Sequence, residues 1–296
     1  MIDTDYNLYL GCIAPLRYPG IEVATRETCE RLGIKLHDMM CATCCPAPGI
    51  FKSLDKATWL VTAARNLSIA NENGFDVLTI CNGCFGSLYE ANQAIKGDEA
   101  LLKSVNGVLE KIGRSFTPKV GVRHYIEILY NDVGLEKVKE SIQRDLSDLK
   151  VVAEYGCHFL RPSEIKKFDE AERPKMLDEL IELTGAKSLD YPEKLSCCGA
   201  GGGVRSREPE TSLKMLIRKL DSMKKAEPDA IVDMCSFCHL QFDRGQKEIE
   251  EKFQKRYDIP VLHYSQLLGI AQGMSPEELG MYAQETPVEP LMEGII

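Results

Sequence analysis

Ten of the twelve cysteines in this 296-residue chain fall into two sets with the same internal order. Each set has a single cysteine, then two adjacent cysteines, then a C-x-x-C pair. The intervening stretches are 31 and 35 residues long in the first set, and 39 and 36 in the second. One order at nearly one spacing indicates a duplicated module. The first set is Cys12, Cys44, Cys45, Cys81 and Cys84, and the second is Cys157, Cys197, Cys198, Cys235 and Cys238.

The segments around the cysteines agree with a duplication. "CCPAPG" corresponds to "CCGAGG", "DVLTICNGC" to "DAIVDMCSFC", and "VRHYIEIL" to "VLHYSQLL". Cys29 and Cys41 have no counterparts in the second half, so we expect them not to be ligands.

Five thiols per module exceed what the common metal sites use. Four thiolates complete a zinc site or an ordinary iron–sulfur cluster. Side chains of adjacent residues usually diverge, so a C-C pair favours a larger or more open cluster. Two alternatives stay open at this point. Two zinc sites would leave one cysteine over in each set, and a dithiol redox protein would leave the adjacent pairs unexplained.

Small residues follow both adjacent pairs and allow the backbone to approach a bound group closely. The second run, "GAGGG", resembles a phosphate-binding loop. It lacks the lysine of that motif and the spacing of a dinucleotide fingerprint, so a nucleotide site is disfavoured.

The elements that must position the cysteines alternate between strand and helix. "YNLYLGC" and "VVAEYGC" are short, apolar and β-prone, and "FDVLTIC" and "DAIVDMC" are typical of buried strands that end at C-x-x-C. Helical patterns follow each C-x-x-C and also occupy residues 53–73 and 206–224. The pattern predicts an α/β fold of two pseudo-symmetric Rossmann-like modules with mainly parallel sheets, and cysteine sites at the carboxyl ends of the strands.

We expect the first module over residues 1–140, the second over 141–272, and a helix and tail over 273–296. The sequence "GLEKVKESIQRDLSDL" between the modules reads as an amphipathic helix. In the tail, Ser275 and Glu278 form a capping-box pattern that predicts a helix start.

Composition narrows the functional classes. The net charge of −9 gives no basic footprint for nucleic acid, and no apolar run approaches a membrane span. The acidic start of the chain carries no secretion-signal pattern, and abundant free cysteines are typical of a reducing compartment, so we expect a cytoplasmic protein. Ferredoxin-type cysteine runs and flavin or nicotinamide fingerprints are absent, so electrons must come from partners.

The two cysteine sets, together with "GCIAPLRYPGIE" near the start, resemble the cysteine-rich CCG-domain family. Within it, residues 8 to about 270 are similar to the B subunits of methanogen heterodisulfide reductases. This resemblance implies two non-cubane [4Fe-4S] clusters, one per CCG module, each held by one of the five-cysteine sets. It also implies that the protein is the catalytic subunit that reduces the mixed disulfide of coenzyme M and coenzyme B to two thiols in methanogenesis.

The resemblance implies a ferredoxin-like C subunit and a flavin-containing A subunit as partners, with a hydrogenase or formate dehydrogenase beyond them. One alternative is an iron–sulfur electron-relay subunit of an oxidoreductase acting on succinate, glycolate or lactate. Another is a zinc-stabilised interaction module.

The substrate carries sulfonate, phosphate and carboxylate groups, so its pocket should hold basic side chains. Candidates near the cysteines include Lys52 and His158, and Arg205 after the glycine run is the preferred one. His124 and His263 occupy equivalent "HY" positions in the two halves and could donate protons. The alternative for both is a shared structural contact at a strand end.

Overall fold

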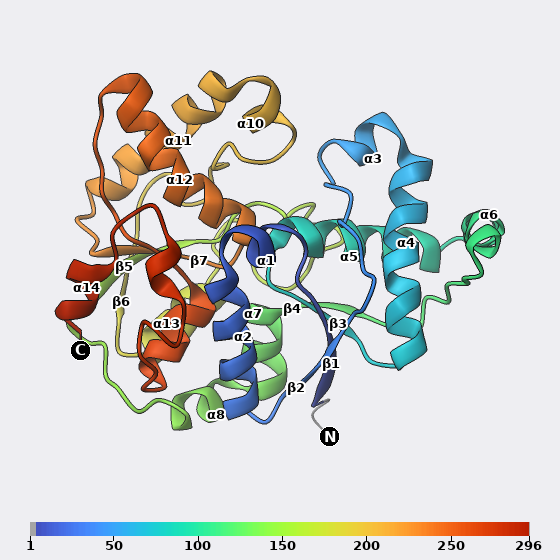
Figure 1. The fold of residues 1–296 in the computed structure, drawn as a ribbon, viewed down its shortest axis with the longest axis horizontal. Coiled ribbons are helices and arrows are strands. Elements are labelled where there is room, and N and C mark those ends of the chain that lie inside the picture. Colours follow the sequence, from blue (N-terminus) through green and yellow to red (C-terminus); the bar gives the residue numbers. More distant parts are fainter. Residues whose placement is uncertain (1–3, 296) are drawn as a thin grey trace.

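The computed structural model of the chain describes residues 4–295, which form two α/β modules (Figure 1). Each module has a four-stranded sheet, in the order β2-β1-β3-β4 and β6-β5-β7-β8. All six strand pairs are parallel. The second sheet repeats the strand order of the first, which confirms the predicted pseudo-symmetric modules.

The two central strands of each sheet are buried and end just before the cysteines. The strands of the first sheet are β1 (Asp5–Tyr9), β2 (Lys35–Asp38), β3 (Val77–Thr79) and β4 (Val122–His124). Those of the second are β5 (Lys150–Glu154), β6 (Lys187–Leu189), β7 (Ala230–Asp233) and β8 (Val261–His263).

Helices connect the strands and cover the sheets. The first module contains α1 (Ile13–Arg17), α2 (Pro19–Arg31), α3 (Phe51–Leu54), α4 (Lys56–Asn73), α5 (Asn82–Lys96), α6 (Glu99–Leu109), the 3₁₀ turn η1 (Glu110–Ile112), α7 (Tyr125–Glu127), the π-helical turn η2 (Ile128–Val133) and α8 (Leu135–Glu140). The second contains α9 (Met176–Leu183), α10 (Val204–Arg207), α11 (Pro209–Lys224), α12 (Ser236–Phe253), α13 (Tyr264–Ala271), the 3₁₀ turn η3 (Met281–Ala283) and α14 (Glu289–Glu293).

Helix ends follow from local sequence chemistry. The Asp55 carboxylate accepts a hydrogen bond from the Thr58 N–H and caps α4, which ends at Gly74 with φ +78°. Pro209 occupies the first turn of α11, where its missing N–H leaves no bond unmade. The helices predicted over 53–73 and 206–224 are therefore confirmed, with starts shifted by three residues.

One predicted helix is shorter than expected, and another does not form. The amphipathic helix between the modules is limited to α8, because the N–H groups of Gln143 and Arg144 donate to the Ala271 carbonyl at 2.8 Å instead of continuing the helix. At Ser275 both capping-box bonds form, to and from Glu278, but the chain turns at Gly280 with φ +58°. The tail continues as irregular chain with η3 and α14.

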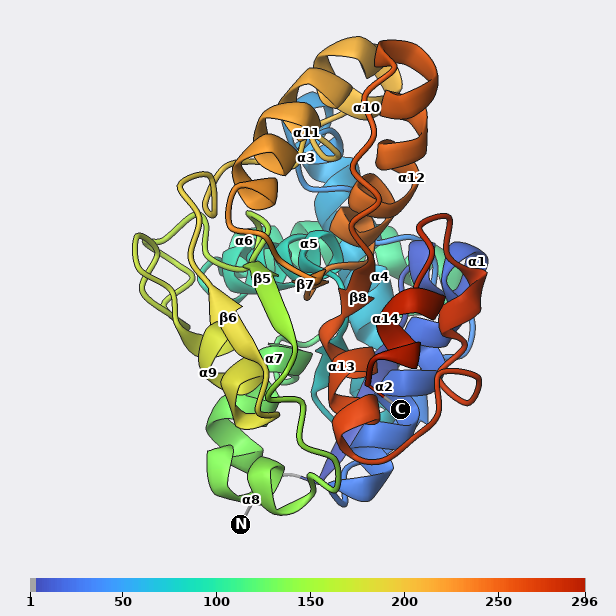
Figure 2. The ribbon, with the colours of Figure 1, turned by 90° about the vertical axis from the view of Figure 1, so that its left-hand side faces the viewer.

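The two modules pack against each other. Figure 2 shows α13 of the second module beside α2 of the first, with the tail and α14 next to both. Two buried hydrogen bonds cross the junction near the cysteines. Ser236 Oγ donates to the Ile80 carbonyl at 3.1 Å, and Asn82 Nδ2 donates to the Tyr155 carbonyl at 2.6 Å. Each C-x-x-C segment is thus bonded to the residue that follows a central strand of the other module.

Candidate metal centre

The structure brings each five-cysteine set together at the carboxyl ends of the central strands. In the first module, thiol contacts run from Cys12 to Cys44, Cys45, Cys84 and Cys81. In the second, they run in the same order from Cys157 to Cys197, Cys198, Cys238 and Cys235. The Sγ atoms of Cys198 and Cys238 lie 3.5 Å apart.

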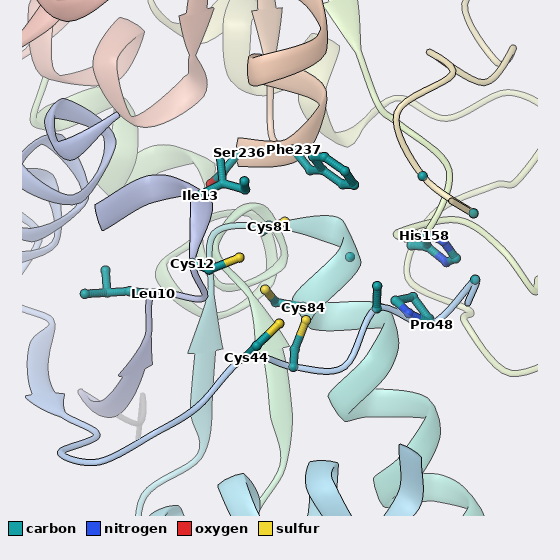
Figure 3. Close-up of a pocket in the computed structure, with 16 residues that line it drawn as sticks. Leu10, Cys12, Ile13, Cys44, Pro48, Cys81, Cys84, His158, Ser236 and Phe237 are labelled. Carbon is teal, nitrogen blue, oxygen red and sulfur yellow. The ribbon is translucent and has the colours of Figure 1, made fainter. Parts of the chain in front are cut away.

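All five cysteines of the first set line one cavity of about 200 Å³. Figure 3 shows Cys12, Cys44 and Cys84 pointing into it, with Leu10 on one side and Pro48 and His158 on the other. Ser236 and Phe237 of the second module complete its wall. The cavity therefore combines thiol ligands with a mainly apolar lining, and both modules build it.

Glycine precedes the first cysteine of each set for a steric reason. Gly11 and Gly156 have φ values of +70° and +63°, in the left-handed region. A Cβ at Gly11 would lie 2.7 Å from the Cys84 Sγ, and one at Gly156 would lie 3.2 Å from the Cys238 Sγ. A side chain at Gly11 would displace the Cys84 thiol, whereas one at Gly156 would displace the Asn82 amide, 2.6 Å away, and crowd the Cys238 thiol.

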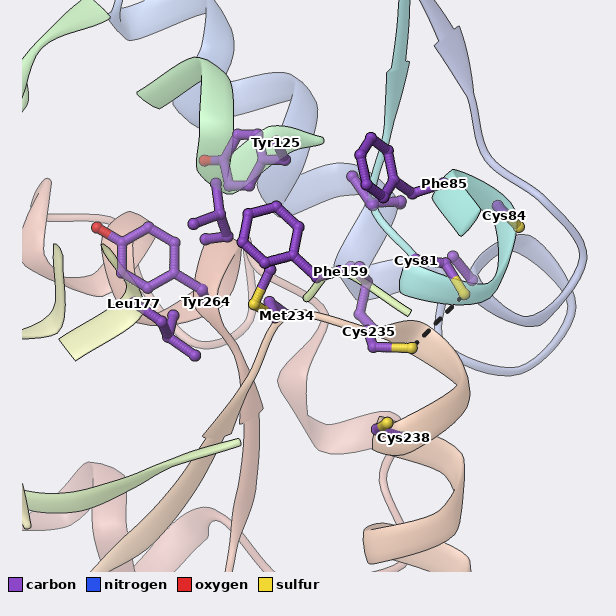
Figure 4. Close-up of a cluster of buried hydrophobic side chains, with 14 of the residues drawn as sticks. Cys81, Cys84, Phe85, Tyr125, Phe159, Leu177, Met234, Cys235, Cys238 and Tyr264 are labelled. Atoms are coloured by element: carbon purple, nitrogen blue, oxygen red, sulfur yellow. Dashed lines mark hydrogen bonds between the residues drawn. The ribbon is translucent and has the colours of Figure 1, made fainter. Parts of the chain in front are cut away.

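The two sets meet at the module junction. Cys81 and Cys235 each begin a C-x-x-C turn, and their Sγ atoms lie 3.7 Å apart (Figure 4). Both thiols are buried. Metal groups bound by the two cysteine sets would therefore be neighbours, because no side chain separates the sets where Cys81 meets Cys235.

The thiols differ in how readily they lose a proton. Hydrogen bonds from neighbouring thiols hold the pKa of Cys44, and likewise that of Cys197, well below the usual range of cysteine. The contact with Cys235 does the same for Cys81. Neighbouring thiols and burial raise the pKa of the other seven cysteines of the two sets. Thiolate is the form that binds metals, so one or two thiols of each set favour that form before a metal binds.

Five converging thiols in an apolar setting fit an iron–sulfur cluster, whose irons take thiolate ligands. Between residues 4 and 295, no group of three or more His, Cys, Asp or Glu side chains is arranged as a single-ion site.

Cys29 and Cys41 stand apart from both sets. Cys29 is buried within α2, and Cys41 is exposed in the loop after β2.

The second module adds a buried ion pair that sequence reasoning missed. Lys219 Nζ lies 2.6 Å from Glu154 Oε2, and both side chains are almost fully buried. Lys219 also donates to the Ser196 carbonyl, beside the Cys197-Cys198 pair. In the first module, the corresponding residues Tyr9 and Asn66 are neutral and donate to the Thr43 carbonyl. Aligning the two cysteine sets residue by residue would have revealed the difference.

A second buried pair lies at the C-x-x-C of the second module. His239 Nδ1 is 2.9 Å from Asp233 Oδ2, and Asp233 also accepts the N–H of Cys235. The first module has Thr79 and Phe85 at these positions. The surroundings of the two sets are thus chemically different despite the shared fold.

Of the residues predicted for substrate and protons, His158 lines the cysteine cavity, whereas Arg205, His124 and His263 do not. Arg205 does not contribute to the lining of the first cysteine cavity, because Gln241 and Glu248 bind its guanidinium at 2.6 Å each. His124 and His263 are fully buried, and their Nδ1 atoms accept N–H groups at the starts of α7 and α13. Burial lowers the pKa of each ring to about 3, so both are neutral at physiological pH.

Comparison with known proteins identifies the family. The model of the cysteine-rich CCG domain matches residues 6–89 and 151–243, one match in each module. The chain is 54% identical to the B subunit of the ferredoxin:CoB-CoM heterodisulfide reductase of Methanosarcina mazei, over 93% of this chain and 91% of that protein. The chain belongs to the family of heterodisulfide reductase B subunits. This confirms the resemblance seen in the cysteine sets, and with it an oxidoreductase subunit.

The chain is also similar to a protein whose name gives another role. The chain is 30% identical to the "8-methylmenaquinol:fumarate reductase membrane anchor subunit" of Wolinella succinogenes, over 94% of this chain and 95% of that protein. In residues 4–295, none of the helices has the length and apolar character needed to cross a bilayer.

The fold of this member of the heterodisulfide reductase B-subunit family also occurs in a solved structure. A hypothetical protein from Helicobacter pylori superposes with a TM-score of 0.76 at 14% identity, covering 96% of this chain and 52% of that one. At this identity, the likeness concerns the fold alone.

Proposed function

We propose that this protein is the catalytic subunit of a heterodisulfide reductase. It reduces the mixed disulfide of coenzyme M and coenzyme B in the methanogenesis of an archaeon, at two non-cubane [4Fe-4S] clusters. The first five-cysteine set holds one cluster and the second set holds the other. The observation that carries the proposal is the contact between the two sets at Cys81 and Cys235, whose Sγ atoms lie 3.7 Å apart.

The reaction requires two electrons and two protons. The sulfur–sulfur bond breaks, each sulfur gains one electron and one proton, and two thiols leave. The clusters, when bound, supply single electrons and iron atoms with affinity for sulfur. Two adjacent clusters match the two electrons, which gives the duplication a chemical reason.

The residues of the chain hold and shield the reacting groups. Leu10, Ile13 and Phe237 give the first cavity apolar walls that exclude water from the disulfide. Gly11 and Gly156 leave room for the sulfurs of their sets. The bonds from Asn82 and Ser236 across the junction fix the distance between the two sets.

Electrons reach the clusters from partners. We propose a ferredoxin-like C subunit and a flavin-containing A subunit, supplied in turn by a hydrogenase or formate dehydrogenase. The name of the Methanosarcina relative, which includes ferredoxin, supports an iron–sulfur electron donor. All twelve cysteines are free thiols, which supports a location in the reducing cytoplasm.

Iron and sulfide analysis of anaerobically purified protein tests the proposal. We expect iron and sulfide for two clusters, and an EPR signal when the oxidised protein is exposed to the disulfide with one of the thiols. Cys198→Ala should remove the iron of one cluster and abolish disulfide reduction, whereas the control Cys41→Ser should retain both. Turnover by a Cys198→Ala protein that has lost a cluster would contradict the two-cluster mechanism.

The similarity to a fumarate reductase subunit favours a second candidate, an electron-relay subunit of an organic-acid oxidoreductase. A relay would accept electrons and pass them on without binding a disulfide. Under this alternative, the reduced protein would not be oxidised by the heterodisulfide, and the thiols would leave its EPR spectrum unchanged.

A further inference from the structure

An open pocket of about 500 Å³ adjoins the cysteine cavity at the module junction. We call it the Lys52 pocket, because Lys52 of α3 forms part of its wall together with Glu90, Arg161 and Cys157. Pro48 and His158 line both the Lys52 pocket and the cysteine cavity. In Figure 3, these two residues stand at the side of the cavity opposite Leu10. The Lys52 pocket and the cysteine cavity therefore adjoin at these two residues, and Cys157 of the second set also lines the Lys52 pocket.

Two lysines share one carboxylate in this pocket. Lys52 Nζ lies 2.6 Å from one oxygen of Glu90, and Lys166 Nζ lies 2.8 Å from the other. Lys166 is fully buried and also donates to the carbonyls of His158 and Arg161, at 2.6 and 2.9 Å. Although burial raises the pKa of Glu90, the two lysines outweigh it and hold that pKa below its usual range. Glu90 is thus ionised, and it balances only one of the two ammonium groups.

The accessible charge at this place belongs to Lys52 and Arg161. The Lys52 side chain is 41% exposed, although its ammonium contacts Glu90. Arg161 is 50% exposed, and its partner Glu172 is 76% exposed. Exposed pairs of this kind contribute little, so an incoming anion can replace Glu172 at low cost. Buried Lys166 holds Glu90 and the backbone of residues 158 and 161 in position beneath these two cations.

The residue equivalent to Lys52 in the other module is more deeply buried and is bound by neighbouring side chains. Arg205 follows Cys198 at the same interval at which Lys52 follows Cys45. The Arg205 side chain is 17% exposed, and its guanidinium is bound by Glu248 and Gln241. Of these two equivalent residues, Lys52 is therefore the more accessible, although the fold is pseudo-symmetric.

We propose that Lys52 and Arg161 bind the anionic end group of the disulfide substrate, a sulfonate or a phosphate, in the Lys52 pocket. The inference rests on the proposed function. Both end groups have several acceptor oxygens, and charge-assisted hydrogen bonds to lysine and arginine are the usual way in which proteins bind them. The shared wall of Pro48 and His158 allows one elongated molecule to reach both the Lys52 pocket and the cysteine cavity.

Steady-state kinetics of the cluster-containing complex tests the proposal, with chemically reduced viologen as electron donor. Lys52→Gln should raise KM for the heterodisulfide about tenfold, because it removes one charge-assisted bond, and should leave kcat nearly unchanged. Arg161→Gln should act in the same direction. KM for bis(2-hydroxyethyl) disulfide, which has no charged end, should stay the same in both variants.

Lys56→Gln is the matched control. Lys56 is an exposed lysine at the start of α4, so this substitution removes the same charge from the same region. It should leave KM unchanged. Iron content is measured for every variant, so that a loss of clusters is not mistaken for a loss of binding. Arg161→Gln provides a second, independent variant if Lys52→Gln fails to assemble.

Product inhibition identifies which end group occupies the pocket. We compare how strongly each product thiol inhibits wild-type and Lys52→Gln protein. If inhibition of the variant is weaker for only one thiol, the one with the sulfonate or the one with the phosphate, the proposal is supported and that thiol carries the end group that binds in the pocket. If wild-type protein reduces the heterodisulfide while both variants keep its KM and both inhibition constants, the Lys52 pocket is not the anion site. Wild-type protein that reduces no disulfide would instead overturn the proposed function.

Discussion

His124 and His263 illustrate how one residue type at one position in both modules can follow from backbone chemistry. Each ring accepts the N–H two residues further on, and each backbone N–H is in turn bound by the side chain three residues on, Glu127 or Gln266. These reciprocal bonds satisfy N–H groups at a helix start that would otherwise be buried without partners. A neutral ring in this role accepts at Nδ1 and carries its one proton at Nε2.

Substitution of His263 separates helix capping from proton donation. Asparagine is a favourable N-cap residue, so His263→Asn should retain the cap, whereas His263→Ala should lower the free energy of unfolding by at least about 1 kcal/mol. We expect similar turnover per bound cluster in both variants. The measurements are chemical denaturation and disulfide reduction. Loss of turnover in the asparagine variant with stability retained would instead support proton donation.

Glu127 should make stability depend on pH. Burial raises the pKa of Glu127 from 4.5 to about 7, although Arg123 opposes the shift. Between these values, the folded state keeps a proton that the unfolded chain has released. The free energy of unfolding should therefore decrease as pH rises from about 4.5 to 7, by at most about 3 kcal/mol from this group.

The second module supplies the control for this prediction. Gln266 occupies the position equivalent to Glu127 and accepts the His263 N–H at 3.0 Å without an ionisable group. Glu127→Gln should keep the capping bond and flatten the pH profile of the unfolding free energy in this window. If the wild-type and variant profiles are parallel, Glu127 titrates normally in the folded protein.

At the scale of elements, the strands that could be predicted from the sequence are the buried central strands. The central strands β1, β3, β5 and β7 are buried apolar runs that end at cysteines, and their pattern predicted them. The edge strands β2 and β6 were missed, because "KLHD" and "KSL" are short, polar and partly exposed. Their pairing depends on the neighbouring strand and not on their own residues.

The same distinction applies to the site. Regular spacing predicted the two cysteine sets that the fold brings together. The contact between Cys81 and Cys235, and the lysine pair around Glu90, join segments that are distant in the chain. Such partners leave no periodic signal, since only the packing of the two modules makes them neighbours.

The glycine loops after the adjacent cysteines determine how closely the modules approach. A Cβ on Gly49 would lie 2.8 Å from the Gly202 Cα, so Gly49→Ala should push the loops apart. We expect a lower thermal midpoint and reduced disulfide turnover. Gly107→Ala is the control, because its Cβ would meet no atom within 4 Å and alanine favours the helix by up to about 1 kcal/mol. If the two variants have the same thermal midpoint and turnover, the loops can move apart without cost to stability or activity.

At the scale of the whole molecule, the C-terminal tail joins the two modules. The carbonyls of Leu279 and Gly280 pack over Gly20 of α2, where a Cβ would lie 2.5 and 2.6 Å from them. Further along, the N–H groups of Glu285 and Thr286 donate to the buried carboxylate of Asp243 on α12, at 3.0 and 2.7 Å. The same carboxylate accepts the hydroxyl of Tyr18 from the first module, at 2.9 Å.

Two truncations test this connection. A chain ending at residue 273 loses both donors to Asp243 and leaves a buried carboxylate with fewer partners, which costs several kcal/mol in comparable cases. It also loses Gln284, whose Oε1 lies 2.6 Å from Nε2 of His239, next to Cys238. We therefore expect a lower thermal midpoint and a loss of iron from the second cysteine set. A chain ending at residue 287 keeps these contacts and loses only α14, so it should retain iron and lose less stability. Equal iron content in the two truncated proteins would indicate that the tail does not support the second site.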